Sequence, residues 1–235
     1  MSDPVKHECG IALIRLLKPL SYYIEKYGTP LYGLKKLYLL MEKQHNRGQD
    51  GAGISNIKLD VDPGQQYIFR KRSVDPSPIA DIFNHVQDYF RDAYEKFPDQ
   101  FSDAEWLKNH VPYSGELMLG HLRYSTHSKS GLQFCHPLIK QNNWMSRNLV
   151  IAGNFNMTNN DELFNNLVQI GQHPRAKNDT VTVLEKFGHF LDEENERLYR
   201  KFREAGYSKK AISPLIIQNL SVKNVLQNSS EDLDG

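Results

Sequence analysis

Apolar residues occur along this chain in short runs and in helical spacing, and the two patterns interleave. The short runs, which polar turn residues bound, predict buried or half-buried strands. One pair of strands is joined by the tripeptide DPG at 62–64, which is typical of a hairpin turn. The strands predicted in this way are residues 10–17, 54–61, 66–72, 116–126 and 148–155.

Amphipathic helices are predicted where apolar residues recur every three or four positions. Capping residues mark several starts, with Thr29 before Pro30, a Ser102–Glu105 capping box, and Asn160 as a cap. The aromatic-rich segment 17–28 is instead predicted to be an irregular connection. The predicted helices are residues 30–44, 79–90, a shorter one from 103, 160–170, and a long one from 179.

Strands interleaved with helices favour an α+β fold with helices layered over sheets. The length of 235 residues is compatible with one domain. A formal net charge of +1 gives no electrostatic argument for nucleic acid or an anionic membrane as partner. There is no run of about 18 apolar residues that would span a bilayer. Two cysteines far apart form no disulfide framework, and a reducing, cytoplasmic setting is expected.

Five polar or glycine-rich motifs need a common explanation, and their order supplies one. They are HECGI (7–11), HNRGQDGAGI (45–54), GHLRYSTHSKSG (120–131), GNFNMTN (153–159) and NDT (178–180). In this order the motifs resemble the glutaminase domain of class II glutamine amidotransferases, which are N-terminal-nucleophile hydrolases. The sequences RGQD and RYST make the resemblance closest to the amidophosphoribosyltransferases.

The resemblance covers roughly residues 7–190 and implies a four-layer αββα sandwich. It also implies that residues 1–8 form a removable leader and that residues 9–235 form the glutaminase domain. Strands that close this domain in the family, and the phosphoribosyltransferase domain beyond them, have no counterpart here. We therefore expect an incomplete domain of marginal stability, and a homo-oligomer in the full enzyme.

Cys9 is the predicted nucleophile. A cysteine thiol has a pKa of about 8.5 and needs a base at neutral pH. If Cys9 were the first residue, its own α-amino group, with a pKa of about 7.7–8.0, would lie within reach as that base. The alternative is a buried strand cysteine, which is the more common role of a lone cysteine.

Substrate-binding roles follow from the resemblance for three further residues. Arg123 is expected to bind the α-carboxylate of L-glutamine through its forked guanidinium. Asp179 is expected to hold the substrate's α-ammonium, and its alternative role is to cap the helix that begins at Thr180. Asn154 matches the asparagine that stabilises the oxyanion, and its alternative role is that of a turn residue.

Two positions depart from the family pattern. Phe155 stands where the family has glycine, which affects the second oxyanion donor and the space beside the substrate. Asn46 is inserted before Arg47, which is expected near the glutamine pocket or as an anchor of the turn. Tyr124, Thr126 and His127 are expected to line the pocket or to pack at the strand end.

No cofactor is expected in this chain, and magnesium would belong to the absent phosphoribosyltransferase domain. Cys135 is expected to be structural, and its pairing with His136 is not expected to bind a metal. The predicted substrate is L-glutamine, and phosphoribosyl pyrophosphate would receive the ammonia only through the missing domain. The alternatives are a catalytically silent scaffold, a glutamine sensor, or the glutaminase of another class II amidotransferase.

Overall fold

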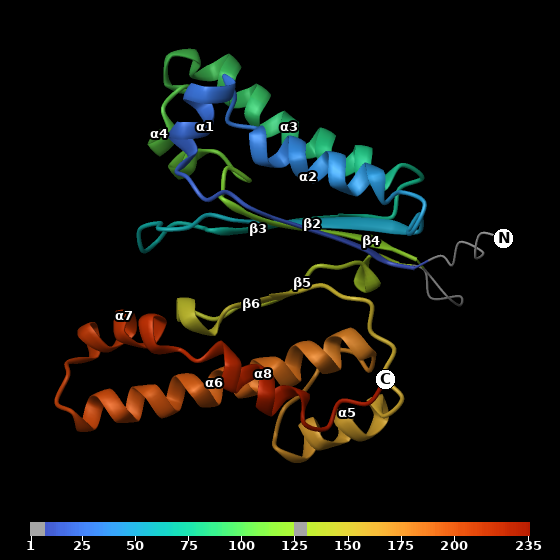
Figure 1. Cartoon of the computed structure of the whole chain (residues 1–235), viewed down its shortest axis with the longest axis vertical. Coiled ribbons are helices and arrows are strands. Elements are labelled where there is room, and N and C mark those ends of the chain that lie inside the picture. Colours follow the sequence, from blue (N-terminus) through green and yellow to red (C-terminus); the bar gives the residue numbers. More distant parts are fainter. Residues whose placement is uncertain (1–7, 125–130) are drawn as a thin grey trace. The chain divides into compact units, whose positions relative to one another are not determined.

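The computed structural model describes residues 8–124 and 131–235. The chain divides into two compact units, Met1–Pro137 and Leu138–Gly235, which are called the N-terminal and the C-terminal unit below. Each unit combines helices with an antiparallel sheet (Figure 1). The predicted α+β class is therefore confirmed.

The N-terminal unit is built on a four-stranded sheet with the strand order β1-β4-β2-β3. All neighbouring strands are antiparallel, and β4 pairs with β1 on one side and with β2 on the other. The register places Gly10 opposite Leu122, and Gly51 opposite Arg123. The strands are β1 (Gly10–Arg15), β2 (Gly51–Ile57), β3 (Ile68–Ser73) and β4 (Leu117–Arg123).

Helices of the N-terminal unit lie along one face of this sheet (Figure 1). Helix α2 contacts β1 and β4, while α3 contacts β2 and β3. Side chains such as Leu37, Ile54 and Ile82 are almost fully buried between the two layers and form the core of the unit. The helices are α1 (Leu20–Tyr27), α2 (Tyr32–Lys43), α3 (Pro78–Lys96) and α4 (Ala104–His110).

Helix α3 shows how closely periodicity predicted this unit. Its buried positions include Ile79, Phe83 and Phe90, which carried the predicted apolar stripe. Pro78 stands in the first turn, where its missing N–H is not needed. The hairpin of β2 and β3 was also predicted, although β2 begins at Gly51, three residues before the predicted start.

Two local predictions in the N-terminal unit were wrong. The segment 17–28 contains helix α1, which a left-handed Gly28 ends at φ 66°. The tyrosine rings of this helix pack on one another and on Tyr32, and they do not follow the regular apolar spacing of an amphipathic helix. The ring centroids of Tyr27 and Tyr32 are 4.2 Å apart. The cap of α4 is Asp103, not Ser102, and its carboxylate accepts from the backbone N–H groups of Glu105 and Trp106.

The C-terminal unit is organised around the long helix α6 (Asp179–Glu204). This helix contacts the other three helices and both strands of the unit. A second apolar cluster, with Leu198, Ile212 and Ile216, holds α7 against α6. The remaining elements are β5 (Leu138–Lys140), β6 (Leu149–Ile151), α5 (Asn160–Gln169), α7 (Lys209–Asn219) and α8 (Val222–Ser230).

Element ends in the C-terminal unit differ from those predicted. The strand expected over 148–155 is only the three-residue β6, and its partner β5 was not predicted. Asn160 lies inside α5 and does not cap it with its side chain. The cap of α6 is Asn178, whose side chain accepts from the N–H of Val181 at 3.0 Å, so Asp179 is not the cap.

Candidate functional site

Strand order in the N-terminal unit brings two predicted site segments to one end of the sheet. Because β1 and β2 both run antiparallel to β4, they begin where β4 ends. Cys9 immediately precedes β1, and Arg123 is the last residue of β4. The Sγ of Cys9, which is half-buried, lies 4.0 Å from the carbonyl oxygen of Tyr124.

The RGQD segment packs against the same end of β4. The N–H of Asp50 donates to the carbonyl oxygen of Arg123 at 3.1 Å. A Cβ on Gly48 would lie only 2.7 Å from the carbonyl carbon of Arg123, so glycine is required for this close approach. The structure therefore brings three of the five sequence motifs together around Cys9, Gly48 and Arg123.

Arg47 lies on the exposed side of this cluster. Its Nη1 forms an ion pair with Oε2 of Glu8 at 3.6 Å, and both side chains are about half exposed. Glu8 is the residue that precedes Cys9, so the Cys9 nitrogen is in a peptide bond in this chain. Exposed pairs of this kind contribute little to stability.

Arg123 faces two neighbours that the sequence did not suggest. Its guanidinium carbon lies 5.2 Å from the centroid of the Phe134 ring, within range of a cation–π interaction. Cys135 is fully buried beside it, and burial raises the pKa of the Cys135 thiol, which makes it a poor nucleophile. Cys135 is thus buried as expected, whereas Phe134 carries no local signal that could have identified it.

Gln44 is a further residue that sequence reasoning missed. Its Nε2 donates to the carbonyl oxygen of Ile11 at 3.1 Å and so fixes the end of α2 to the start of β1, beside Cys9. A glutamine at the end of a helix is common, and only the tertiary contact shows this role. Gln44 thus holds the start of β1, the strand that follows Cys9 directly.

Three predicted site residues belong to the C-terminal unit and are described within it. Asn154 is exposed in the loop after β6. The ring of the half-buried Phe155 packs directly on Gly153. A Cβ added to Gly153 would lie only 2.3 Å from this ring. Asp179 is the first residue of α6, and its Oδ2 accepts from the N–H of Met157 at 3.1 Å. Asp179 therefore ties the 154–157 loop to the start of α6.

Two predicted pocket residues, Thr126 and His127, lie outside the described residues. Over residues 8–124 and 131–235, no three His, Cys, Asp or Glu side chains are grouped so that they could hold a metal ion. In the same ranges, no helix is long and apolar enough to cross a membrane.

Comparisons with known proteins point in the direction that the motifs predicted. No family model matches the chain. Over 159 residues, 68% of its length, the chain is 26% identical to the amidophosphoribosyltransferase of Archaeoglobus fulgidus, of which it covers 27%. The solved glutamine phosphoribosylpyrophosphate (PRPP) amidotransferase of B. subtilis, complexed with ADP and GMP, matches 86% of this chain with a TM-score of 0.48 and 20% identity.

The chain spans about a quarter of the A. fulgidus protein and 31% of the B. subtilis structure. The sequence match extends over two thirds of the chain, and the motifs that carry the resemblance are spread over a similar length. Over those 159 residues, the chain is similar in sequence to an amidophosphoribosyltransferase.

Proposed function

We propose that this chain is the glutaminase part of an amidophosphoribosyltransferase-like enzyme and releases ammonia from L-glutamine. The observation that carries the proposal is the convergence of Cys9, the RGQD turn and Arg123 at one end of the sheet in the N-terminal unit. Amide hydrolysis of an amino acid needs a nucleophile, a base, an oxyanion donor and a group that binds the charged end of the substrate. This end of the sheet supplies the nucleophile and the guanidinium.

The proposed reaction proceeds through a thioester on Cys9. With Cys9 as the first residue, its α-amino group takes the thiol proton while Sγ attacks the δ-carbonyl carbon of glutamine. The carbon–nitrogen bond breaks, the amine returns the proton, and ammonia leaves. Water then attacks the thioester, which releases glutamate and restores the thiol.

Removal of the leader would change two groups at once. Hydrolysis of the bond between Glu8 and Cys9 would free the α-amine that serves as base. It would also take away the carboxylate that pairs with Arg47 at 3.6 Å. Arg47 would then be available for the glutamine pocket, which is the role that the resemblance implies for it.

The other proposed roles are those that the resemblance assigns. Arg123 binds the α-carboxylate of glutamine, beside Tyr124. Asp179 holds the α-ammonium in addition to its bond to Met157, and Asn154 donates to the oxyanion with the N–H of Phe155. One such oxyanion donor contributes about 3–4 kcal/mol. Thr126 and His127 complete the proposed pocket.

The acceptor and the surroundings of the reaction are also part of the proposal. In a full-length enzyme the ammonia would pass to phosphoribosyl pyrophosphate, in a separate transferase domain that uses magnesium. The proposed fold of the complete glutaminase is the four-layer αββα sandwich, in a homo-oligomeric enzyme of purine synthesis in the cytoplasm.

A second candidate function is a catalytically silent, glutamine-binding domain. The observation that favours it is that Cys9 follows Glu8 in a peptide bond and so has no free amine in this chain. Phe155, in place of a glycine, would also narrow the space beside the substrate. This candidate predicts glutamine binding without ammonia release.

Ammonia release from L-glutamine distinguishes the two candidates. We expect a chain prepared with Cys9 as its first residue to release ammonia, and Cys9→Ala in the same chain to release none. The chain that retains residues 1–8 is the matched control and should be inactive unless it processes itself. Ammonia release that survives Cys9→Ala would contradict the proposal.

The role of Arg123 is tested separately by Arg123→Lys. A lysine keeps the charge but loses the forked geometry that binds a carboxylate through two hydrogen bonds. We expect KM for glutamine to rise about 10- to 100-fold, as the loss of a charged hydrogen bond predicts. An unchanged KM would remove Arg123 from the substrate site.

A further inference from the structure

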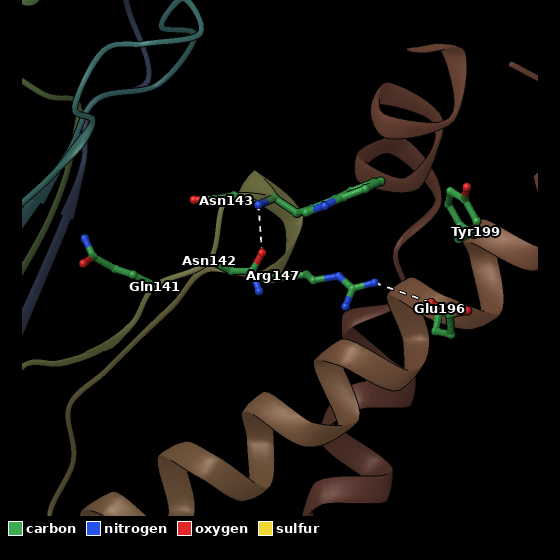
Figure 2. Close-up of a pocket in the computed structure, with 7 residues that line it drawn as sticks. Gln141, Asn142, Asn143, Arg147, Glu196 and Tyr199 are labelled. Carbon is green, nitrogen blue, oxygen red and sulfur yellow. Dashed lines mark hydrogen bonds and ion pairs between the residues drawn. The ribbon is translucent and has the colours of Figure 1, made fainter. Parts of the chain in front are cut away.

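A pocket of about 580 Å³ lies within the C-terminal unit, between the loop that joins β5 to β6 and helix α6 (Figure 2). Its walls are residues 141–144 and Arg147 of the loop, with Glu196 and Tyr199 of α6. The volume is in the range of pockets that hold small molecules. None of these residues has a role in the proposed glutaminase reaction.

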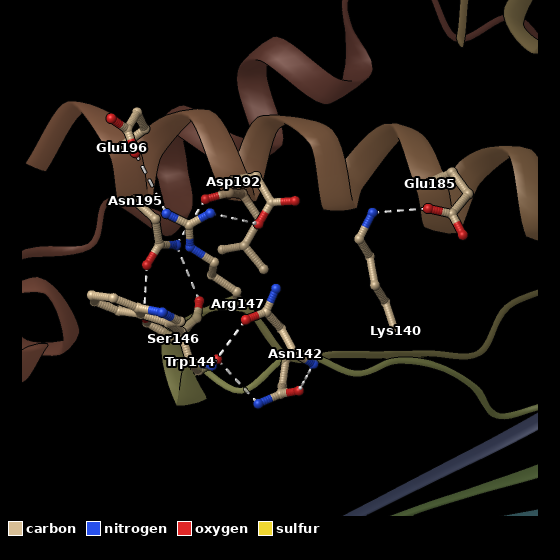
Figure 3. Close-up of polar contacts among 11 residues, drawn as sticks. Lys140, Asn142, Trp144, Ser146, Arg147, Glu185, Asp192, Asn195 and Glu196 are labelled. Atoms are coloured by element: carbon tan, nitrogen blue, oxygen red, sulfur yellow. Dashed lines mark hydrogen bonds and ion pairs between the residues drawn. The ribbon is translucent and has the colours of Figure 1, made fainter. Parts of the chain in front are cut away.

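The loop that forms one wall is fixed in a single shape by hydrogen bonds (Figure 3). Within it, Asn142 Oδ1 accepts from the N–H of Trp144 at 2.9 Å, and Asn148 Oδ1 accepts from the N–H of Asn142 at 2.7 Å. The fully buried Asn195 of α6 donates to the carbonyl oxygen of Ser146 at 3.2 Å. A pre-organised wall lowers the entropy cost of binding a ligand.

Arg147 and Glu196 line the pocket, and their charges are balanced by each other and by the groups that pair with them. Arg147 forms ion pairs with Asp192 at 3.7 Å and with Glu196 at 3.6 Å (Figure 3). Arg200 in turn pairs with Glu196 at 3.6 Å. Two positive and two negative groups leave no net charge to attract an ion. A charged ligand would also separate existing pairs, so this balance of charges favours an uncharged ligand.

Arg147 nevertheless keeps hydrogen-bonding capacity. The distances from its Nη atoms to Asp192 and Glu196 exceed those of a hydrogen bond, and the Arg147 side chain is 23% exposed. Among the described residues, Arg147 makes no hydrogen bond from its guanidinium. Neutral oxygen atoms could therefore accept from this group without displacing an existing bond.

Two aromatic rings form a corner of the pocket. The ring centroids of Trp144 and Tyr199 lie 6.1 Å apart, and the planes meet at 83°. Trp144 is 37% exposed, and the Arg147 guanidinium lies 5.7 Å from its centroid. Rings at a right angle cannot sandwich a flat nucleobase between parallel faces. One of them can still stack against the apolar face of a puckered ring.

Side-chain amides supply the remaining contacts. In the part of the chain that the structure describes, Gln141 and Asn143 form no hydrogen bond through their side chains, and Figure 2 shows both on the loop. A primary amide donates and accepts, which matches a hydroxyl group, since a hydroxyl also does both. A neutral ring with several hydroxyl groups could form hydrogen bonds with both of these amides.

We propose that this pocket binds an uncharged sugar ring, with the apolar face of the ring on Trp144. Its hydroxyls meet the amides of Gln141 and Asn143 and the free donors of Arg147. This proposal is independent of the glutaminase reaction, and either one can fail alone.

Tryptophan fluorescence tests the sugar site, because the chain has only two tryptophans. In the Trp106→Phe variant, Trp144 is the only reporter, and the probes are methyl β-D-glucopyranoside, methyl β-D-galactopyranoside and adenosine. We expect a saturable change with one of the two pyranosides, with a Kd on the order of 1 mM. A response that does not saturate with either pyranoside, or that saturates with adenosine only, would overturn the proposal.

Matched alanine variants separate a specific site from a general solvent effect. Asn143→Ala removes an amide that makes no hydrogen bond in the described residues, so the fold should persist while sugar binding weakens about 2- to 10-fold. Asn165→Ala, an exposed asparagine of α5 outside the pocket, should leave binding unchanged. Equal affinity in both variants would refute the site.

A second readout covers the case in which Trp106→Phe does not fold. The indole N–H signal of Trp144 in a ¹H–¹⁵N spectrum of the unchanged chain is assigned by its loss in Trp144→Phe. A saturable shift of that signal alone with the pyranoside supports the site, and a shift of neither indole signal overturns it.

Discussion

Gly48 shows how a single residue sets the geometry of the candidate site. Its backbone lies so close to β4 that any Cβ would stand 2.7 Å from the carbonyl carbon of Arg123. We expect Gly48→Ala to lower the free energy of unfolding by about 1–3 kcal/mol, because the turn must move away from the strand. Chemical denaturation measures this change, and exposed Gln49→Ala is the neighbouring control, for which a change below about 0.5 kcal/mol is expected.

Lys58 predicts a pH dependence of stability. Burial lowers the pKa of Lys58 to about 8, although the carboxylate of Glu116 acts in the opposite direction. Its Nζ donates to the carbonyl oxygen of Lys108 and lies 4.7 Å from the centroid of the Phe69 ring. The side chain is therefore held in a place that disfavours its charge.

The sign of the Lys58 effect follows from proton linkage. Above pH 8 the folded state loses the Lys58 proton while the unfolded chain, with a pKa near 10.4, still binds it. Stability contributed by Lys58 should therefore rise between pH 8 and about 10, by at most about 1.4 kcal/mol per pH unit. Unfolding free energies of wild type and Lys58→Met at pH 7.5 and 9.5 measure it, and an equal change in both proteins would exclude this residue as the cause.

At the scale of elements, the N-cap of α4 can be tested by mutation, and the residue before it serves as the control. Asp103 accepts from two backbone N–H groups, at 2.9 and 3.1 Å, whereas Ser102 is exposed and is not the cap. We expect Asp103→Ala to reduce the free energy of unfolding by about 1 kcal/mol. Ser102→Ala should change it by only a few tenths of that amount, and the reverse order would restore the capping box as the correct interpretation.

Helix α6 gives a prediction for the C-terminal unit. Asn195 is fully buried and donates to the carbonyl oxygens of Ser146 and Leu191, so it joins the β5–β6 loop to the helix. We expect Asn195→Leu to destabilise the unit by about 1–3 kcal/mol, since buried polar groups of the loop lose their partner. Hydrogen exchange of the loop amides should rise in this variant, and unchanged exchange would show that the loop does not depend on Asn195.

Elements with clear periodicity could be predicted from the sequence, and those without it could not. The apolar stripe of α3 and the hairpin of β2 and β3 carry their own local signals. Helix α1 escaped prediction because tyrosines of α1 pack on each other and on Tyr32 without regular apolar spacing. Strand β5, of three residues, is too short for any period to be seen.

At the scale of the whole chain, the motifs predicted which segments matter but not how they meet. The contact of Cys9 with Tyr124 joins residues 115 positions apart. It depends on the pairing of β1 with β4, which no local pattern encodes. Phe134 approaches Arg123 in the same way, through tertiary contacts alone. The order of the motifs, not periodicity, was the signal that predicted the candidate site.

The central claim is that Cys9 forms a thioester with the glutamyl group of its substrate. The most direct measurement is the intact mass of a chain that begins at Cys9, after brief incubation with L-glutamine and an acid quench that preserves thioesters. We predict a mass increase of one glutamyl group, located on Cys9 by peptide mapping and absent in Cys9→Ala. Ammonia release without any adduct on Cys9, or an adduct on another residue, would contradict the account.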